Sequence, residues 1–251
     1  MSPFNDNLKR IRISEIALIL LALILIFGFF EIDDIWMNVI VIAYILFRCR
    51  KAVFQLPDEI ADTFSRISFK TCLVIVVTNI ILAIALGYAM DYLIYLFPYI
   101  DYMPGYEVEE AAGLSFAYLI TFVDVVVIAP VLEEFIFRGI ILNRLGRRIP
   151  IILAILLSSL LFGFLHGTSG FVSAFIFGVC ACIVYLKTQN IFASISIHFL
   201  NNLVAMILEM VSGNIAFLES DIFIAVILIL GLLSLAYIVK FIIEGYKEIA
   251  D

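Results

Sequence analysis

The chain has 251 residues, of which 65% are hydrophobic and only 15% charged, and its formal net charge is −7. Its mean hydropathy is +1.17. A soluble domain averages about 45–50% apolar and about 25% charged residues, so this composition excludes an ordinary soluble domain and indicates an integral membrane protein. We expect the lipid bilayer as a partner and no nucleic acid.

The first apolar run, residues 13–30, follows Lys9, Arg10 and Arg12. This run is longer than the apolar core of a secretory signal, which has about 7–15 residues, and no small-residue cleavage site ends it. The sequence therefore predicts a first membrane span rather than a removable signal.

Seven further apolar runs follow, and a span needs about 17–25 residues. The runs are 35–48, 71–97, 114–143, 149–166, 170–187, 189–211 and 221–243. The second run of the chain is short and is expected to be tilted or shallow. The fourth is long enough to contain a break, for which Pro130 is the obvious place. We predict an all-α polytopic membrane protein with about eight transmembrane helices.

Loop charges predict the orientation of these spans. Clustered Lys and Arg residues precede the first run or follow the second and fourth, whereas the acidic segment 101–110 follows the third. Loops rich in Lys and Arg stay on the cytoplasmic side of a membrane. Both termini are therefore predicted to be cytoplasmic.

The segment 54–70 has an amphipathic pattern. Apolar residues recur at helical spacing among charged ones: Phe54, Leu56, Ile60, Phe64 and Ile67 among Asp58, Glu59, Asp62 and Arg66. Such a segment is predicted to lie along the cytoplasmic membrane interface. The alternative is a simple connector between spans.

Four cysteines, Cys49, Cys72, Cys180 and Cys182, have no spacing typical of disulfides or zinc sites. Cys180 and Cys182 are two residues apart in a predicted helix, so they point to roughly opposite faces and cannot bind one ion together. We expect all four to be small packing residues.

We divide the chain into three parts: N-terminal helices with the interfacial segment (1–113), a catalytic helical core (114–211) and a last transmembrane helix (212–251). The middle part carries nearly all of the intramembrane acids, bases and cations. Ionisable side chains in hydrocarbon are costly and mark a functional site by default. Function is therefore sought in residues 114–211.

The first motif is Glu133-Glu134-Phe-Ile-Phe-Arg138, inside the fourth run. Residues four apart share a helix face, so Glu134 and Arg138 are predicted to form a structural ion pair. Glu133 points about 100° away and stays available for chemistry. Two adjacent carboxylates in low dielectric resist joint ionisation, so one of them should hold a proton more firmly than an isolated glutamate does. Such a glutamate is suited to act as a general base and acid. The alternative is an ion-pair cluster that only specifies packing.

The chain has two histidines, and both lie inside apolar runs. Phe162 precedes His166 by four residues and Asn202 follows His198 by four, so each pair shares one helix face. One imidazole is expected to help Glu133 hold a water, and the other, with Asn202, to donate hydrogen bonds to a developing oxyanion. Alternatively, Asn202 bonds a neighbouring helix, and Phe162 is expected to be core packing.

Helical rise raises a question of depth. Counting about 1.5 Å per residue from the cytoplasmic ends places His166 deeper than Glu133 and His198 shallower. Tilted helices, or a broken helix at Pro130, would bring the three side chains to one level.

The three motifs, Glu-Glu-x-x-x-Arg, Phe-x-x-x-His and His-x-x-x-Asn, lie in this order on separate spans. They resemble the motifs of the CPBP (Abi) family, whose members include Rce1-type CAAX prenyl endopeptidases and bacteriocin-processing or self-immunity membrane proteins. The resemblance covers about residues 114–211. It implies a membrane-embedded, glutamate-dependent peptidase that hydrolyses peptide bonds without a covalent intermediate and without a cofactor.

The resemblance also implies a role for each motif residue. Glu133 corresponds to the glutamate that activates water, and His166 to its partner at that water. His198 and Asn202 correspond to the pair that stabilises the oxyanion. The second glutamate and the arginine of the first motif are expected to support the site. The link between the histidines is shorter than in Rce1-type members, so the CAAX specificity stays open.

Three other functions are alternatives to a glutamate-dependent peptidase. Glu133, His166 and His198 form an N₂O set like that of some zinc enzymes, although no His-Glu-x-x-His motif is present. Glutamates and histidines in spans also serve proton-coupled transporters, but no inverted repeat is evident. The third alternative is a non-catalytic membrane immunity or scaffold protein.

The expected substrate is a membrane-anchored protein or peptide. Prenylated CAAX C-termini, pheromone or bacteriocin precursors and membrane-protein tails are all compatible with the motifs. We expect a multi-pass protein of the cell membrane whose active site is reached from the cytoplasmic side. The sequence makes no prediction of oligomeric state.

Overall fold

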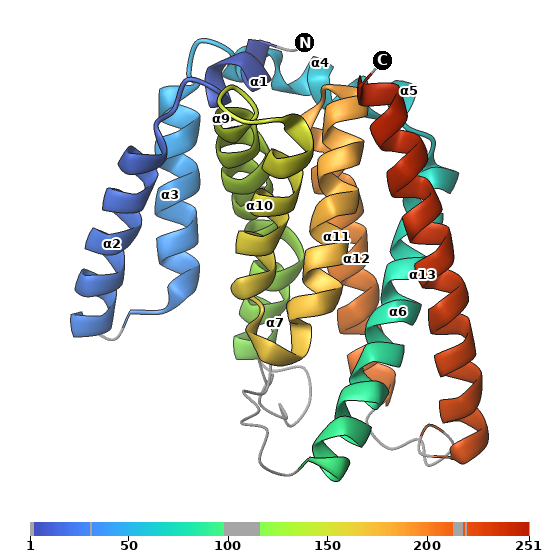
Figure 1. Ribbon diagram of the computed structural model, residues 1–251. Coiled ribbons are helices and arrows are strands. Elements are labelled where there is room, and N and C mark those ends of the chain that lie inside the picture. Colours follow the sequence, from blue (N-terminus) through green and yellow to red (C-terminus); the bar gives the residue numbers. More distant parts are fainter. Residues whose placement is uncertain (1–2, 31, 98–115, 213–217, 219, 251) are drawn as a thin grey trace.

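The computed structural model describes residues 3–30, 32–97, 116–212, 218 and 220–250. Every element assigned within these ranges is a helix. The long helices run side by side in one bundle, and α1 (Pro3–Leu8) lies at the same end of the bundle as the C-terminal end of α13 (Asp221–Ala250) (Figure 1). The acidic segment 101–110 lies outside the described residues.

The predicted apolar runs coincide with helices. Seven of them correspond to α2 (Ile13–Phe30), α3 (Asp34–Arg48), α6 (Phe69–Leu96), α10 (Ile151–Phe164), α11 (Gly167–Thr188), α12 (Ile191–Ser212) and α13. In the described part of the chain, α2, α6, α11, α12 and α13 are long and apolar enough to cross a membrane, whereas α3 and α10 are shorter apolar helices. A multi-pass membrane protein is supported, and the number of eight spans and their orientation remain predictions.

The fourth predicted run is not one regular helix. It consists of α7 (Phe116–Val123), the π-helix η2 (Asp124–Ile128), α8 (Ala129–Glu134), the π-helix η3 (Phe135–Leu142) and α9 (Asn143–Leu145). The two π-helical segments flank the six residues that contain both motif glutamates. Single π-turns inside α-helices are frequent at functional sites.

The side chain of Asn143 bonds main-chain oxygens near the end of η3. The amide nitrogen of Asn143 donates to the main-chain oxygens of Arg138 (2.7 Å) and Gly139 (2.9 Å). The same nitrogen lies 2.7 Å from the Tyr185 hydroxyl of α11. The end of η3 is therefore attached to the centre of the bundle.

Helix α11 forms that centre. All of residues 177–185 are buried, on every side of the helix. A helix that is apolar all round belongs in the interior of a bundle, and α11 packs against α6, α10, α12 and α13. The four cysteines are also buried and unbridged, as expected for packing residues.

Helices α2 and α3 form a hairpin at one edge of the bundle (Figure 1). Glu15 of α2 pairs with Arg48 of α3 and accepts a hydrogen bond from the Tyr44 hydroxyl at 3.0 Å. The amide nitrogen of Asn38 donates to Asp124 at 3.1 Å, which connects α3 to η2. Polar bonds therefore join this hairpin to the segment that carries the first motif.

The amphipathic segment is divided into the 3₁₀ turn η1 (Val53–Gln55), α4 (Leu56–Ala61) and α5 (Thr63–Arg66). Phe54, Ile60 and Phe64 face outward, at 90%, 51% and 55% exposed, whereas Leu56 packs against the core and Ile67, Glu59 and Thr63 are buried. An outward apolar face is what an interfacial segment requires. Its contact with a membrane remains a prediction.

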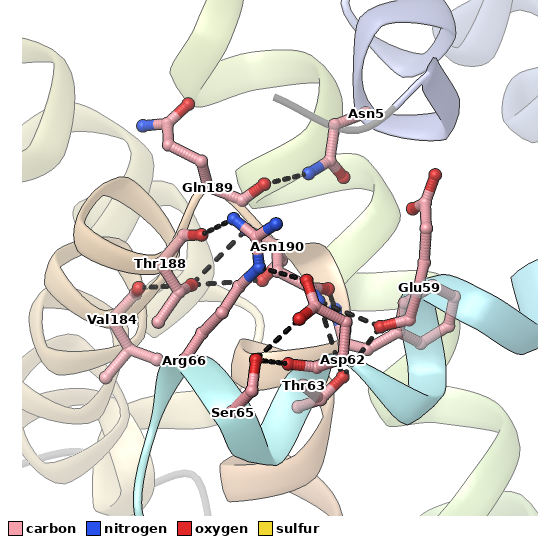
Figure 2. Close-up of polar contacts among 11 residues, drawn as sticks. Asn5, Glu59, Asp62, Thr63, Ser65, Arg66, Val184, Thr188, Gln189 and Asn190 are labelled. Carbon is pink, nitrogen blue, oxygen red and sulfur yellow. Dashed lines mark hydrogen bonds and ion pairs between the residues drawn. The ribbon is translucent and has the colours of Figure 1, made fainter.

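Polar contacts hold this segment to the turn between α11 and α12, as Figure 2 shows. The last carbonyls of a helix have no intrahelical donors. Here Arg66 donates to the main-chain oxygen of Thr188 at 3.0 Å, and Asn5 of α1 donates to that of Gln189 at 2.6 Å. Asn190 in turn donates to the main-chain oxygen of Glu59 at 2.9 Å. The short helices therefore cap the end of α11.

Candidate active site

Glu134 and Arg138 form a completely buried ion pair. Both side chains are 0% exposed, and the Arg138 Nη1 donates to the Glu134 Oε1 at 2.7 Å. The Arg138 Nη2 donates to the main-chain oxygen of Gly178 in α11 at 3.2 Å. The guanidinium carbon also lies 4.5 Å from the ring centroid of Phe162 in α10. The predicted structural pair is present, and it connects the fourth run to two other helices.

His198 of α12 bonds the same carboxylate. Its Nδ1 lies 2.9 Å from the Glu134 Oε1, and its side chain is 2% exposed. A carboxylate only accepts hydrogen bonds, so the Nδ1 must carry the proton of this bond. The Nε2 of a neutral His198 then has a free lone pair. Glu134 therefore fixes both the orientation and the tautomer of this imidazole.

Glu133 lies on the other side of that imidazole. Its Oε2 is 3.7 Å from the His198 Nε2, and its side chain is 26% exposed, in contrast to the fully buried Glu134. A separation of 3.7 Å is too long for a direct hydrogen bond, and one water bonded to both atoms would bridge it. Glu133 is thus the motif carboxylate outside the ion pair, as the sequence predicts.

His166 lies in the turn between α10 and α11 and bonds back to α10. Its Nδ1 lies 2.8 Å from the main-chain oxygen of Phe162, one turn earlier. A carbonyl oxygen accepts, so this nitrogen also carries the proton, and the Nε2 has the lone pair when the ring is neutral. No contact between His166 and Glu133 is present among the described interactions. The predicted Glu133–His166 partnership therefore stays a prediction.

The ring of Phe162 lies between the motifs. Its centroid is 4.5 Å from that of His166 and 5.6 Å from that of His198. Phe177 of α11 contacts His198 from another direction, with centroids 5.1 Å apart. Phe162 is 1% exposed, so it is core packing as expected, and it also positions both imidazoles and the guanidinium. In the sequence, only the four-residue spacing between Phe162 and His166 indicates that Phe162 positions an imidazole.

The depth difference counted from helical rise does not separate the motifs. The His198 Nε2 lies 3.7 Å from Glu133, and His166 packs on the same phenylalanine as His198. The reason is local. His166 lies in the turn after α10, and the contact of its Nδ1 with the Phe162 oxygen brings its ring back over Phe162. The fourth run is also irregular on both sides of α8, as expected for a break near Pro130.

Asn202 bonds a carbonyl that Pro130 leaves without a donor. The Ala129 N–H donates to the Asp124 oxygen, five residues back, in the π pattern. In the same pattern the Val125 oxygen would accept from the N–H of residue 130, but residue 130 is a proline and has no N–H. The Asn202 Nδ2 donates to the Val125 oxygen instead, at 2.8 Å. The structure therefore contains the bond to a neighbouring helix that was the alternative for Asn202, and the second N–H of the amide remains for other partners.

No three His, Cys, Asp or Glu side chains within the described ranges are arranged so that they could hold one metal ion. The geometry therefore does not favour the zinc alternative.

Replacing Arg138 with alanine should strongly destabilise the protein. The substitution leaves the Glu134 carboxylate buried without its cation, which costs about 3–5 kcal/mol when one partner of a buried pair is removed. Thermal unfolding in detergent measures the effect. The matched control is Lys240→Ala, which removes an exposed i,i+4 partner of Glu244 and should change stability by about 0–1 kcal/mol. Equal stabilities for the two variants would contradict a stabilising role for the buried pair.

Asn202→Ala should destabilise the wild-type background by about 0.5–1.5 kcal/mol, because it removes a hydrogen bond to the partly buried Val125 carbonyl. In a Pro130→Ala background the restored N–H supplies a donor to this turn, so the same substitution should cost clearly less. Thermal unfolding of the four proteins gives the coupling. Purely additive effects would show that Pro130 and Asn202 are not linked through this carbonyl.

One comparison with known proteins identifies a related family. Residues 115–204, a little over a third of the chain, match the family model described as "Type II CAAX prenyl endopeptidase Rce1-like". No curated protein and no solved structure matches the chain significantly. The matched segment includes Glu133, Glu134, Arg138, His166 and His198, together with Asn202. The match agrees with the resemblance seen in the motifs, and residues 115–204 are similar to the Rce1-like type II CAAX prenyl endopeptidases.

Proposed function

We propose that this protein is a membrane-embedded endopeptidase in which Glu133 activates a water for attack on a peptide bond. One observation carries the proposal: the His198 imidazole lies between the two motif glutamates, bonded to Glu134 at 2.9 Å and 3.7 Å from Glu133. The family match supports a membrane hydrolase of this class. The glutamate chemistry and the roles below are inferred from the geometry.

Charge balance explains why Glu133 and His198 should act together. The Glu134 carboxylate and the Arg138 guanidinium neutralise each other in a fully buried pair. The remaining two groups, Glu133 and His198, are neutral overall when they share one proton in addition to the proton on the His198 Nδ1. That proton is either on His198, with Glu133 ionised, or on Glu133, with His198 neutral. A pair that shares one proton in a low-dielectric site can both accept and return a proton.

Peptide hydrolysis needs these two transfers. Glu133 would accept a proton from the attacking water and later give it to the leaving amine, so no covalent intermediate forms. The lone pair of the His166 Nε2 is suited to hold the same water. The Nε2 of a protonated His198 and the second amide hydrogen of Asn202 would donate to the oxyanion. Such donors are each worth about 10²–10³ in rate in other hydrolases.

The site would be reached from the end of the bundle where α1 lies. Helix α12 begins there, and His198 is only seven residues from its first residue, Ile191. The partial exposure of Glu133 supports access of a substrate to this carboxylate. If the sequence-based orientation holds, this end is cytoplasmic.

The substrate class follows from the family. The matched description names CAAX prenyl endopeptidases, so we propose membrane-associated proteins as substrates and a prenylated CAAX C-terminus as the first to test. Precursors of pheromones or bacteriocins remain the alternative substrates. No residue of the site requires a cofactor for the steps above.

Glu133→Gln should abolish cleavage of a farnesylated CAAX peptide, because a neutral amide cannot accept the proton of water. Release of the C-terminal tripeptide, measured by mass spectrometry, reports the activity of the purified protein. Thermal stability should be nearly unchanged, since Glu133 is partly exposed and outside the buried ion pair. Glu244→Gln, an exposed glutamate on α13, is the matched control and should retain wild-type activity.

Three results would overturn this assignment. Full activity of the Glu133→Gln variant would remove glutamate catalysis. Loss of activity on treatment with a chelator, restored by zinc, would favour a metal enzyme. Absence of cleavage of prenylated and unprenylated membrane peptides by the wild-type protein would favour a transporter or a non-catalytic scaffold.

A further inference from the structure

A buried amide outside the family-matched segment points toward the proposed oxyanion residue. Asn79 lies in the interior of α6, among apolar neighbours such as Ile75, Val76 and Ile80, and is 4% exposed. A buried amide is unfavourable unless it is hydrogen-bonded. Its Nδ2 donates to the Oδ1 of Asn201 in α12 at 2.9 Å. The bond joins residues 122 positions apart in the sequence.

This bond is the first of three that run in one direction. The Asn201 Nδ2 donates to the Oδ1 of its neighbour Asn202 at 3.4 Å. The Asn202 Nδ2 then donates to the main-chain oxygen of Val125 at 2.8 Å. Asn79 donates to Asn201, and Asn201 and Asn202 each accept at the amide oxygen and donate from the nitrogen, so the three hydrogen bonds run in one direction from α6 to η2.

Such a chain has two effects on Asn202. It fixes the amide at both ends, the oxygen through Asn201 and the nitrogen through Val125, so the second N–H has a defined direction. It also polarises the amide, because an amide that accepts a hydrogen bond becomes a better donor, by about 10–30% per bond. A donor that is both fixed and strengthened is what stabilisation of an oxyanion requires.

We propose that Asn79 is a positioning residue of the active site, which acts on Asn202 through Asn201. This inference rests on the proposed function, since it assigns a source to the donor strength of the oxyanion amide. It extends the functional unit to α6, outside residues 115–204 that match the family. The Rce1-like segment would then depend on an N-terminal helix for full activity.

A purely structural role explains Asn79 less well. Its Oδ1 is buried and has no hydrogen-bond partner among the described residues, so the amide loses hydration that it does not fully recover. A leucine would fill the same space among these apolar neighbours without that loss. Thr78, the preceding residue, contrasts with it because its hydroxyl donates to carbonyls of its own helix, at 2.7 and 3.1 Å.

The test is a double-mutant cycle on turnover. Asn79→Leu, Asn202→Ala and the double variant are purified as full chains and assayed with the farnesylated CAAX peptide for kcat and KM. Thr78→Val is the matched control, which removes a polar group from the same turn of α6 without touching the amide chain. Thermal unfolding of each variant is measured in parallel.

We expect Asn79→Leu to lower kcat about 3- to 10-fold, a fraction of the effect of losing an oxyanion donor outright. KM and thermal stability should stay close to the wild-type values, and Thr78→Val should leave kcat unchanged. In the Asn202→Ala background the added Asn79→Leu change should have no further effect on kcat, because the residue through which Asn79 acts is gone.

Three outcomes overturn the inference, and they are distinguishable. If Asn202→Ala lowers kcat but Asn79→Leu leaves it unchanged, or lowers it equally in both backgrounds, Asn79 does not act through Asn202 and the proposed function survives. If Asn202→Ala itself leaves kcat unchanged, the oxyanion role fails and the positioning role fails with it. A fall in kcat for Asn79→Leu that Thr78→Val reproduces would assign the effect to the structure of α6.

Discussion

The buried pair of Glu134 and Arg138 is the interaction on which the rest of the site depends. A guanidinium and a carboxylate that are both 0% exposed are tolerated only with complementary charge and further hydrogen bonds. Arg138 reaches Gly178 of α11 and the ring of Phe162 in α10, and Glu134 reaches His198 of α12. One ion pair therefore fixes the positions of four helical segments, and it presents the imidazole of His198 to Glu133.

A second constraint comes from the backbone of the fourth run. Pro130 has no N–H to give the Val125 carbonyl, which accepts from Asn202 instead, and Asn143 gives further hydrogen bonds to the main-chain oxygens of Arg138 and Gly139. An irregular helix inside a membrane bundle is stable only when such groups are satisfied by neighbours. Asn202, which bonds the backbone at Val125, is therefore also proposed to carry the chemistry, and Asn143 bonds the backbone of Arg138 in the first motif.

Much of this arrangement could be predicted from local spacing. Apolar runs located the helices, because a span needs a continuous apolar segment, and the i,i+4 rule predicted the pair of Glu134 with Arg138. Contacts between distant segments could not be predicted. Nothing in the sequence near His198 shows that it lies between both glutamates. Likewise, Asn79 is an amide in an apolar run, and no local pattern indicates its bond to Asn201. The interfacial segment was predicted as one amphipathic stretch, whereas it consists of short separate turns.

The most direct test of the central claim is the tautomer of His198, read by ¹⁵N NMR of histidine-labelled protein in detergent. The chain has only two histidines, so a His166→Gln variant assigns both rings. If Glu134 orients the imidazole, the Nδ1 of His198 carries a proton in the folded protein. A His198 ring with an unprotonated Nδ1 and a protonated Nε2 would contradict the account.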